Sequence, residues 1–200
     1  MGQANEQACL GWDCSRQCQT DAILSRAICR GACGGKGRIA STDGPTNLDA
    51  GKGGINAKHL IDSNVLLDIC EEDPLWLPWS QAALSWVLDQ GGAAINPLIL
   101  AEVSVGFAKI EELETALPED LFERHPLPWE AAFLAGKAFL KYRHATGLKR
   151  SPMPDFYIGA HAAIAGLILV TRDPRRYRQH FPRLELVAPD THFQEFAPKS

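Results

Sequence analysis

Residues 155–173 constrain the fold of this 200-residue chain more than any other stretch. Pro154 fixes a backbone angle that suits the first turn of a helix, and Gly166 is placed to end that helix in a left-handed conformation. The apolar run 167–170 that follows predicts a short strand buried on both faces. A helix joined by one glycine to a buried strand is typical of an α/β fold.

Strand and helix patterns alternate along the chain from residue 58. We expect strands at 59–61, 93–95, 121–123 and 185–187, and helices at 65–70, 78–90, 97–107, 110–117 and 129–145. Ser63 or Asn64 is expected to cap the first of these helices. Asn96 and Pro97 are expected to open the third. The alternation predicts one three-layer α/β/α domain with a central, mostly parallel sheet at residues 58–190.

The two ends of the chain have a different composition. Residues 1–57 lack apolar periodicity, and residues 31–54 are rich in Gly, Ser, Thr, Asp and Asn, so this segment is either a disordered extension or a non-native start. Residues 191–200 form a tail. Five of the six cysteines lie near the N-terminus at spacings unlike those of zinc sites, so no metal or disulfide module is predicted there, and their role stays open: Cys9, Cys14, Cys18, Cys29 and Cys33.

Charge and hydropathy exclude some classes of protein. The net charge is −4, which argues against a simple basic nucleic-acid binder and leaves only local basic patches for phosphate contacts. The first residues contain no apolar segment of a secretion signal. The longest unbroken apolar run, 162–170, is too short to cross a bilayer. We therefore expect a soluble cytoplasmic protein without membrane partners.

Four acids occupy positions that a parallel sheet would bring together. Asp62 follows the first strand, Glu102 lies in the third helix, Asp155 starts a helix and Asp173 follows a late strand. The carboxyl ends of parallel strands border one crevice, so these side chains are expected to meet there. Each acid alone has an ordinary explanation: a helix cap, a helix-surface charge, an acid favoured by a helix dipole, or an Asp-Pro turn.

Glu102 has an unusual predicted position. It shares one helix face with Leu98, Ala101 and Val105, so the spacing places its carboxylate on an apolar side. An unpaired carboxylate there would be costly, and it is therefore expected to point into a cleft or to lose its charge.

Clustered carboxylates must be protonated, paired or bridged by a cation. Oxygen-only ligands favour Mg²⁺, or alternatively Mn²⁺, over zinc. Such a site activates water and neutralises phosphate charge, as phosphodiester hydrolysis requires. Ser63, Asn64 and Thr171 lie beside the acids in sequence and are expected to orient them.

These residues resemble the signature of PIN domains, and more narrowly of the VapC toxins of bacterial type II toxin–antitoxin modules. The resemblance covers residues 58–190 and rests on Ile-Asp-Ser-Asn-Val at 61–65, Glu102 after Asn96-Pro97, Pro-Asp-Phe-Tyr-Ile-Gly-Ala-His-Ala at 154–162, and Leu-Val-Thr-Arg-Asp at 169–173. Residues 1–57 have no counterpart in the family, and Ser63 stands where threonine is commoner.

The resemblance implies a Mg²⁺-dependent endoribonuclease toxin that is inhibited by a cognate VapB-type antitoxin and is usually a homodimer. Asp62, Glu102, Asp155 and Asp173 would be its catalytic, metal-binding acids. The expected reaction is in-line attack of activated water on an RNA phosphodiester, which leaves a 5′-phosphate and a 3′-hydroxyl. The alternative is a non-catalytic protein of the same fold that acts through an antitoxin complex, for instance in repressing its own operon.

Features for substrate and partner binding are less specific. Candidate RNA-binding residues flank two of the acids, although solvated surface charge explains them equally well: Lys141, Arg143, Lys149, Arg150, Arg172, Arg175, Arg176 and Arg178. His161 is expected to be packed or interfacial rather than catalytic. Trp76, Trp79 and Trp86 belong either to the core or to a docking surface.

Overall fold

The computed structural model describes residues 57–147 and 153–198. Its sheet is formed by β1 (His59–Ile61), β2 (Ala93–Ile95), β3 (Phe122–Arg124), β4 (Ile168–Val170) and β5 (Leu186–Val187). Helices alternate with these strands: α3 (Ser63–Cys70), α4 (Leu77–Asp89), α5 (Pro97–Ser104), α6 (Ile110–Ala116), α7 (Trp129–Thr146), α8 (Pro154–Ala165), α9 (Arg175–His180) and the 3₁₀ helix η1 (Gln194–Phe196).

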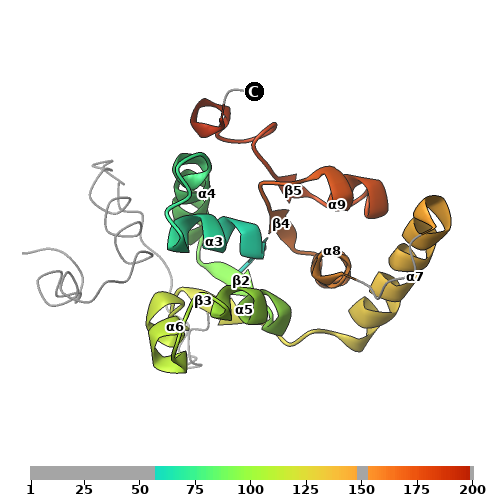
Figure 1. Ribbon diagram of the computed structural model, residues 1–200, viewed down its shortest axis with the longest axis horizontal. Coiled ribbons are helices and arrows are strands. Elements are labelled where there is room, and N and C mark those ends of the chain that lie inside the picture. Colours follow the sequence, from blue (N-terminus) through green and yellow to red (C-terminus); the bar gives the residue numbers. More distant parts are fainter. Residues whose placement is uncertain (1–56, 148–152, 199–200) are drawn as a thin grey trace, which may run out of the picture.

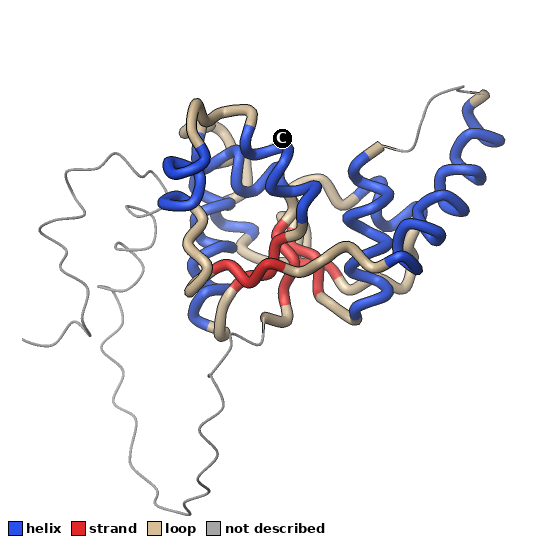
Figure 2. Tube along the Cα trace, turned by 90° about the horizontal axis from the view of Figure 1, so that it is seen from below, coloured by secondary structure: helices blue, strands red, loops and turns tan. Residues whose placement is uncertain are grey.

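All five strands are parallel, in the order β3-β2-β1-β4-β5. The chain moves from β1 outward to β3, then returns across β1 to β4 and β5, so the direction of the connections reverses next to β1. Right-handed crossovers place the helices of these two halves on opposite faces of the sheet. Figure 2 shows the strands between two groups of helices. The predicted three-layer α/β/α fold is confirmed.

The core lies on both faces of the sheet. Every residue of β1 and β2 is buried, which explains why these strands read as short continuous apolar runs rather than as alternating ones. The largest fully buried side chains are Trp79, Phe122 and Phe156. Helix α7 packs mainly on α8, which lies between it and the sheet (Figure 1).

Several helix ends follow local chemistry. The Asn96 side chain accepts hydrogen bonds from the backbone N–H groups of Leu98 and Ile99, as predicted for the cap of α5. Gly147 and Gly166 end α7 and α8 with φ of 70° and 67°, a left-handed conformation that glycine adopts at little cost. Both predicted stops are confirmed.

Other predictions of local structure were wrong. The N-cap of α3 is Asp62, and the residues expected to cap it, Ser63 and Asn64, lie inside the helix. The Asp62 side chain makes no cap bond and instead accepts hydrogen bonds from other side chains of the site. Helix α9 was not predicted, since Tyr177 is its only buried residue and its sequence has almost no apolar periodicity. Helix α5 ends at Ser104 rather than at Phe107.

Candidate active site

Asp62 is the centre of the polar cluster at the carboxyl end of the sheet. It is 3% exposed, and its backbone N–H donates to the carbonyl of Val170 at 2.9 Å, which ties it to the end of β4. Its Oδ2 accepts hydrogen bonds from Asn64 Nδ2 (2.8 Å), Thr171 Oγ1 (2.7 Å) and the Tyr177 hydroxyl (3.0 Å). These donors are all neutral, so hydrogen bonds hold the carboxylate in place without a compensating positive charge.

Ser63 joins Asp62 to Glu102. The Ser63 hydroxyl donates to Glu102 Oε2 at 2.7 Å and lies 3.5 Å from Asp62 Oδ1. The hydroxyl of Ser63, on α3, therefore lies between Asp62 and Glu102 of α5, two acids that are 40 positions apart in sequence. The three residues expected beside the acids, Ser63, Asn64 and Thr171, all contact them.

The prediction that Glu102 lies on the apolar face of its helix was wrong. The buried residues of α5 are Ile99 and Val103, whereas Val105 is 87% exposed and Ala101 is also exposed. Glu102 is half-buried at the edge of the helix and is hydrogen-bonded to Ser63. Its carboxylate is therefore not set against an apolar face, and its position at the site is instead explained by this hydrogen bond.

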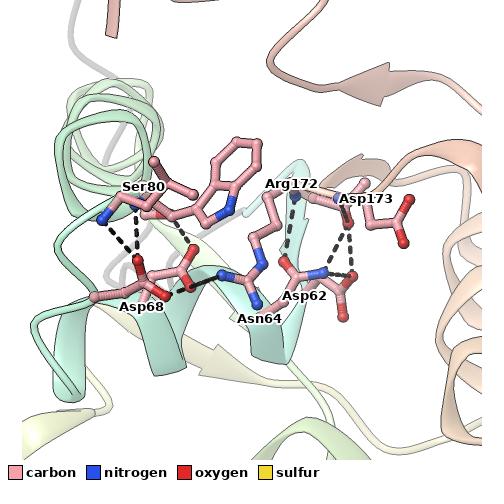
Figure 3. Close-up of polar contacts among 10 residues, drawn as sticks. Asp62, Asn64, Asp68, Ser80, Arg172 and Asp173 are labelled. Carbon is pink, nitrogen blue, oxygen red and sulfur yellow. Dashed lines mark hydrogen bonds and ion pairs between the residues drawn. The ribbon is translucent and has the colours of Figure 1, made fainter. Parts of the chain in front are cut away.

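Asp155 and Asp173 lie toward the outside of the cluster. Asp155 is in the first turn of α8, and its carboxylate forms an ion pair with Arg176 of α9. Asp173 is exposed. Its backbone N–H donates to Thr171 Oγ1 at 3.2 Å, and its own carboxylate accepts from the backbone N–H of Arg175 at 3.4 Å. Figure 3 shows Asp173 directed away from the Arg172 side chain.

Electrostatics indicate that three of the acids are close neighbours. Burial is the main cause that raises the pKa of Asp62 to about 6, and the charges of Asp155 and Glu102 raise it further. Hydrogen bonds from Thr171 and Tyr177 act in the opposite direction. Near neutral pH Asp62 is therefore largely ionised in an environment that lacks a positive partner.

The donor chemistry of the cluster fits a hard divalent cation. Its side chains offer carboxylate and hydroxyl oxygens, the ligand types that Mg²⁺ and Mn²⁺ prefer. Within residues 57–147 and 153–198, no three acid, histidine or thiol side chains are gathered tightly enough to hold one ion. Mg²⁺ is usually bound by only one or two carboxylates and keeps several waters, so this spacing is compatible with it.

Tyr177 is a site residue that sequence reasoning missed. It lies on α9, whose approach to α8 depends on Gly159, because a Cβ added there would come within 2.6 Å of the Phe181 ring and 2.9 Å of Tyr177. This close approach brings the buried Tyr177 hydroxyl to Asp62. A glycine inside an apolar helix was the available signal, since such a residue often marks close packing.

The basic residues near the acids are largely paired with acids. Arg176 pairs with Asp155, and Arg178 pairs with Asp190 through two hydrogen bonds. Arg175 is exposed. Lys149 and Arg150 lie outside the described residues.

Arg172 pairs with a buried acid rather than facing the cluster. Its guanidinium forms an ion pair with Asp68, which is 2% exposed. Burial raises the pKa of Asp68 to about 6, although hydrogen bonds from Ser80 and Arg172 and the arginine's charge oppose this.

Two further predictions concern aromatic residues. His161 is 1% exposed, its Nδ1 lies 3.1 Å from Asn96 Nδ2, and burial lowers its pKa, so its interpretation as a packed residue is confirmed. Trp79 is fully buried, and its Nε1–H donates to the carbonyl of His192 at 2.9 Å. Trp76 and Trp86 are partly buried against the core.

Comparison with known families identifies the domain. A model of the PIN domain matches residues 59–182, which include all four acids. The chain belongs to the PIN domain family. Members of this family are generally nucleases, which supports a nuclease activity for this chain.

Three solved structures are similar to this chain, and the first of them shares its fold. VapBC2 from Rickettsia felis bound to a DNA fragment from their promoter has a TM-score of 0.50 at 20% identity, over 65% of this chain and 97% of that one. DNA-bound VapBC from Salmonella typhimurium has a TM-score of 0.49 at 20% identity, over 66% and 97%. A toxin–antitoxin complex from Klebsiella pneumoniae has a TM-score of 0.45 at 25% identity, over 66% and 97%.

Two further observations concern related sequences and membrane-spanning helices. No sequence among the curated proteins matches the chain significantly. In the part of the PIN domain and its flanks that the structure describes, no helix is long and apolar enough to span a membrane.

Proposed function

We propose that this PIN domain is a metal-dependent endoribonuclease and acts as the toxin of a type II toxin–antitoxin module. The observation that carries the proposal is the environment of Asp62. Its carboxylate is buried and hydrogen-bonded only by neutral donors, and the charges of Asp155 and Glu102 act on it. Such a site is costly unless a cation offsets the negative charge, so it serves binding rather than stability.

The proposed metal-binding residues are Asp62, Glu102, Asp155 and Asp173, with Mg²⁺ as the preferred ion and Mn²⁺ as a substitute. Because no three of the described acids are gathered tightly enough to hold one ion, one or two of them would bind it directly and the others through its waters. When bound between these acids, the cation would supply an activated water and would neutralise charge on the phosphate. The residues of the chain prepare this chemistry. Thr171 and Tyr177 fix the orientation of Asp62, and the Ser63 hydroxyl holds Glu102 beside it.

Arginines of α9 are proposed to bring the RNA phosphates to the acids. Arg176 pairs with Asp155, and its side chain is 53% exposed, so it would contact a phosphate that lies beside this acid. Arg175 is exposed one position earlier. Lys149 and Arg150, which lie outside the described residues, stay proposed RNA-binding residues because of their place in the sequence before Asp155.

Two protein partners belong to the proposal. VapBC2 from Rickettsia felis, which shares the fold, was solved as a complex bound to promoter DNA. We infer a cognate VapB-type antitoxin for this chain. We also infer a homodimer through the outer face of α7, where Trp129 is 89% and Phe133 68% exposed at a spacing of one helical turn. Exposed aromatic side chains of this size are typical of interfaces.

The test compares two aspartates that both pair with an arginine of α9. Asp155→Asn removes a proposed metal-binding acid, whereas Asp190→Asn removes the acid that pairs with Arg178 outside the cluster. Mn²⁺ affinity is measured by calorimetry, and cleavage is followed on a single-stranded RNA and on DNA of the same sequence.

We expect Asp155→Asn to lose metal binding and RNA cleavage, and Asp190→Asn to retain both. Equal cleavage by the two variants would contradict the proposed active site. Cleavage of the DNA in preference to the RNA would reassign the substrate. Metal binding without cleavage of either would favour the non-catalytic alternative.

A further inference from the structure

We propose that Arg172 is a positioning residue, which anchors the loop that carries Thr171 and Asp173 to helix α3 through the buried carboxylate of Asp68. This inference rests on the proposed function and adds a role that the sequence did not suggest, because Arg172 was expected to bind RNA. Figure 3 shows its side chain reaching from the loop toward Asp68, on the side away from Asp173.

Arg172 makes contacts in two directions. Its backbone N–H donates to Asn64 Oδ1 at 3.3 Å, and the same asparagine donates to both Asp62 and Thr171. Its guanidinium forms an ion pair with Asp68, which is four positions after Asn64 and therefore lies one turn further along α3. Backbone and side chain thus fix the loop to two successive turns of one helix.

A second helix, α4, also holds Asp68 in place. Ser80 of α4 donates to Asp68 Oδ2 at 2.6 Å, which leaves the other carboxylate oxygen for the arginine. The guanidinium also lies 3.7 Å from Asp73 and has its central carbon 5.7 Å from the centre of the Trp76 ring. A planar cation between two carboxylates and an aromatic face has a defined orientation.

These contacts limit what Arg172 can offer to RNA. Its side chain is 31% exposed, and both of its acidic neighbours would have to be given up for it to reach a phosphate. Releasing it would leave the carboxyl group of Asp68 buried, at 2% exposure, and without a cation, so that this group would either stay charged at a cost or take up a proton. The arginine therefore holds its neighbours Thr171 and Asp173 in place, and the exposed Arg175 is better placed for RNA.

Asp68→Asn gives the sharpest test, because this residue is buried and cannot contact RNA. Arg172→Ala removes the other half of the pair. Arg183→Ala is the control, since it removes one exposed positive charge outside the network. Three properties of the full chain are measured: hydrogen exchange of the Arg172 and Asp173 amides, Mn²⁺ affinity, and RNA affinity without metal.

We expect Asp68→Asn and Arg172→Ala to speed exchange of the two amides at least tenfold and to weaken Mn²⁺ binding at least fivefold. Affinity for RNA without metal should stay within twofold of wild type, and Arg183→Ala should leave exchange and Mn²⁺ binding unchanged. If Arg172→Ala does not fold, Asp68→Asn alone tests the proposal, because this substitution keeps the shape of the side chain.

Unchanged amide exchange in Asp68→Asn would overturn the proposal, and so would a loss of RNA affinity in Arg172→Ala at normal Mn²⁺ affinity. The exchange measurement needs neither metal nor activity. If the wild-type protein bound no metal at all, the proposed function would fail while the anchoring of the loop could still be decided.

Discussion

Replacing Asp62 by asparagine should stabilise the protein while abolishing its activity. The pKa of Asp62 is raised from 3.8 to about 6, so keeping it ionised in the folded state costs free energy. One pKa unit corresponds to about 1.4 kcal/mol, which gives about 3 kcal/mol as the largest gain from removing the charge. The carbonyl oxygen of the new side chain can still accept the hydrogen bonds from Thr171 and Tyr177.

The stability that Asp62→Asn gains should be larger at high pH than at low pH. Because the folded-state pKa of Asp62 is raised, this carboxyl group contributes most stability when it is protonated, and that contribution is lost as the pH rises through about 6. Asp68 has a pKa raised in the same way, but it is present in both proteins and cancels in the difference. Asp62→Asn should therefore gain up to about 3 kcal/mol at pH 8 and only about a third of that at pH 4.5.

Thermal and urea unfolding in EDTA at the two pH values measure this difference. A gain of 2 to 3 kcal/mol would raise the melting temperature by roughly 4 to 12 °C for a domain of this size. The matched control is Asp190→Asn, whose wild-type carboxylate is stabilised by Arg178 and which should lose stability instead. A destabilised Asp62→Asn variant at pH 8, or a difference that is the same at both pH values, would refute the electrostatic account of the site.

Three other substitutions probe the packing and the surfaces. Gly159→Ala should destabilise the fold by about 1–3 kcal/mol, because the added methyl group overlaps the ring of Phe181, and urea unfolding would measure it. Tyr177→Phe removes a hydrogen bond to the charged Asp62 and should cost about 1.5–3 kcal/mol at pH 8 together with a loss of Mn²⁺ affinity; unchanged affinity would contradict its role. Phe133→Glu should convert the homodimer to monomer in analytical ultracentrifugation while the melting temperature at low concentration stays close to that of wild type.

The sequence predicted the sheet and the helices α3 to α8 because buried parallel strands and glycine stops leave local signals, but it did not predict α9. It also predicted that Asp62 and Thr171 would follow strands at the carboxyl end of the sheet, although it did not predict that these two strands are neighbours. It failed for Glu102, because α5 is apolar on almost every face and its periodicity could not select the buried one. The face was decided by packing between helices, and tertiary contacts of that kind do not appear in a local pattern.

The roles of arginine and tyrosine residues were harder to predict for the same reason. Arg172 and Arg176 look alike in sequence, yet one pairs with a buried acid of α3 and the other with Asp155 of α8. Tyr177 reaches Asp62 only because Gly159 allows α9 to approach α8 closely. Each assignment depends on contacts between segments that are far apart in the chain.

Cleavage of total cellular RNA by the purified protein tests the central claim most directly. The reaction is run with Mg²⁺ or with EDTA, beside the Asp155→Asn variant, after any bound antitoxin has been stripped, and the fragment ends are mapped. We predict cuts at discrete sites that carry 5′-phosphates and that require both Mg²⁺ and Asp155. Intact RNA across a range of Mg²⁺ and Mn²⁺ concentrations, or equal cleavage by Asp155→Asn, would contradict the account.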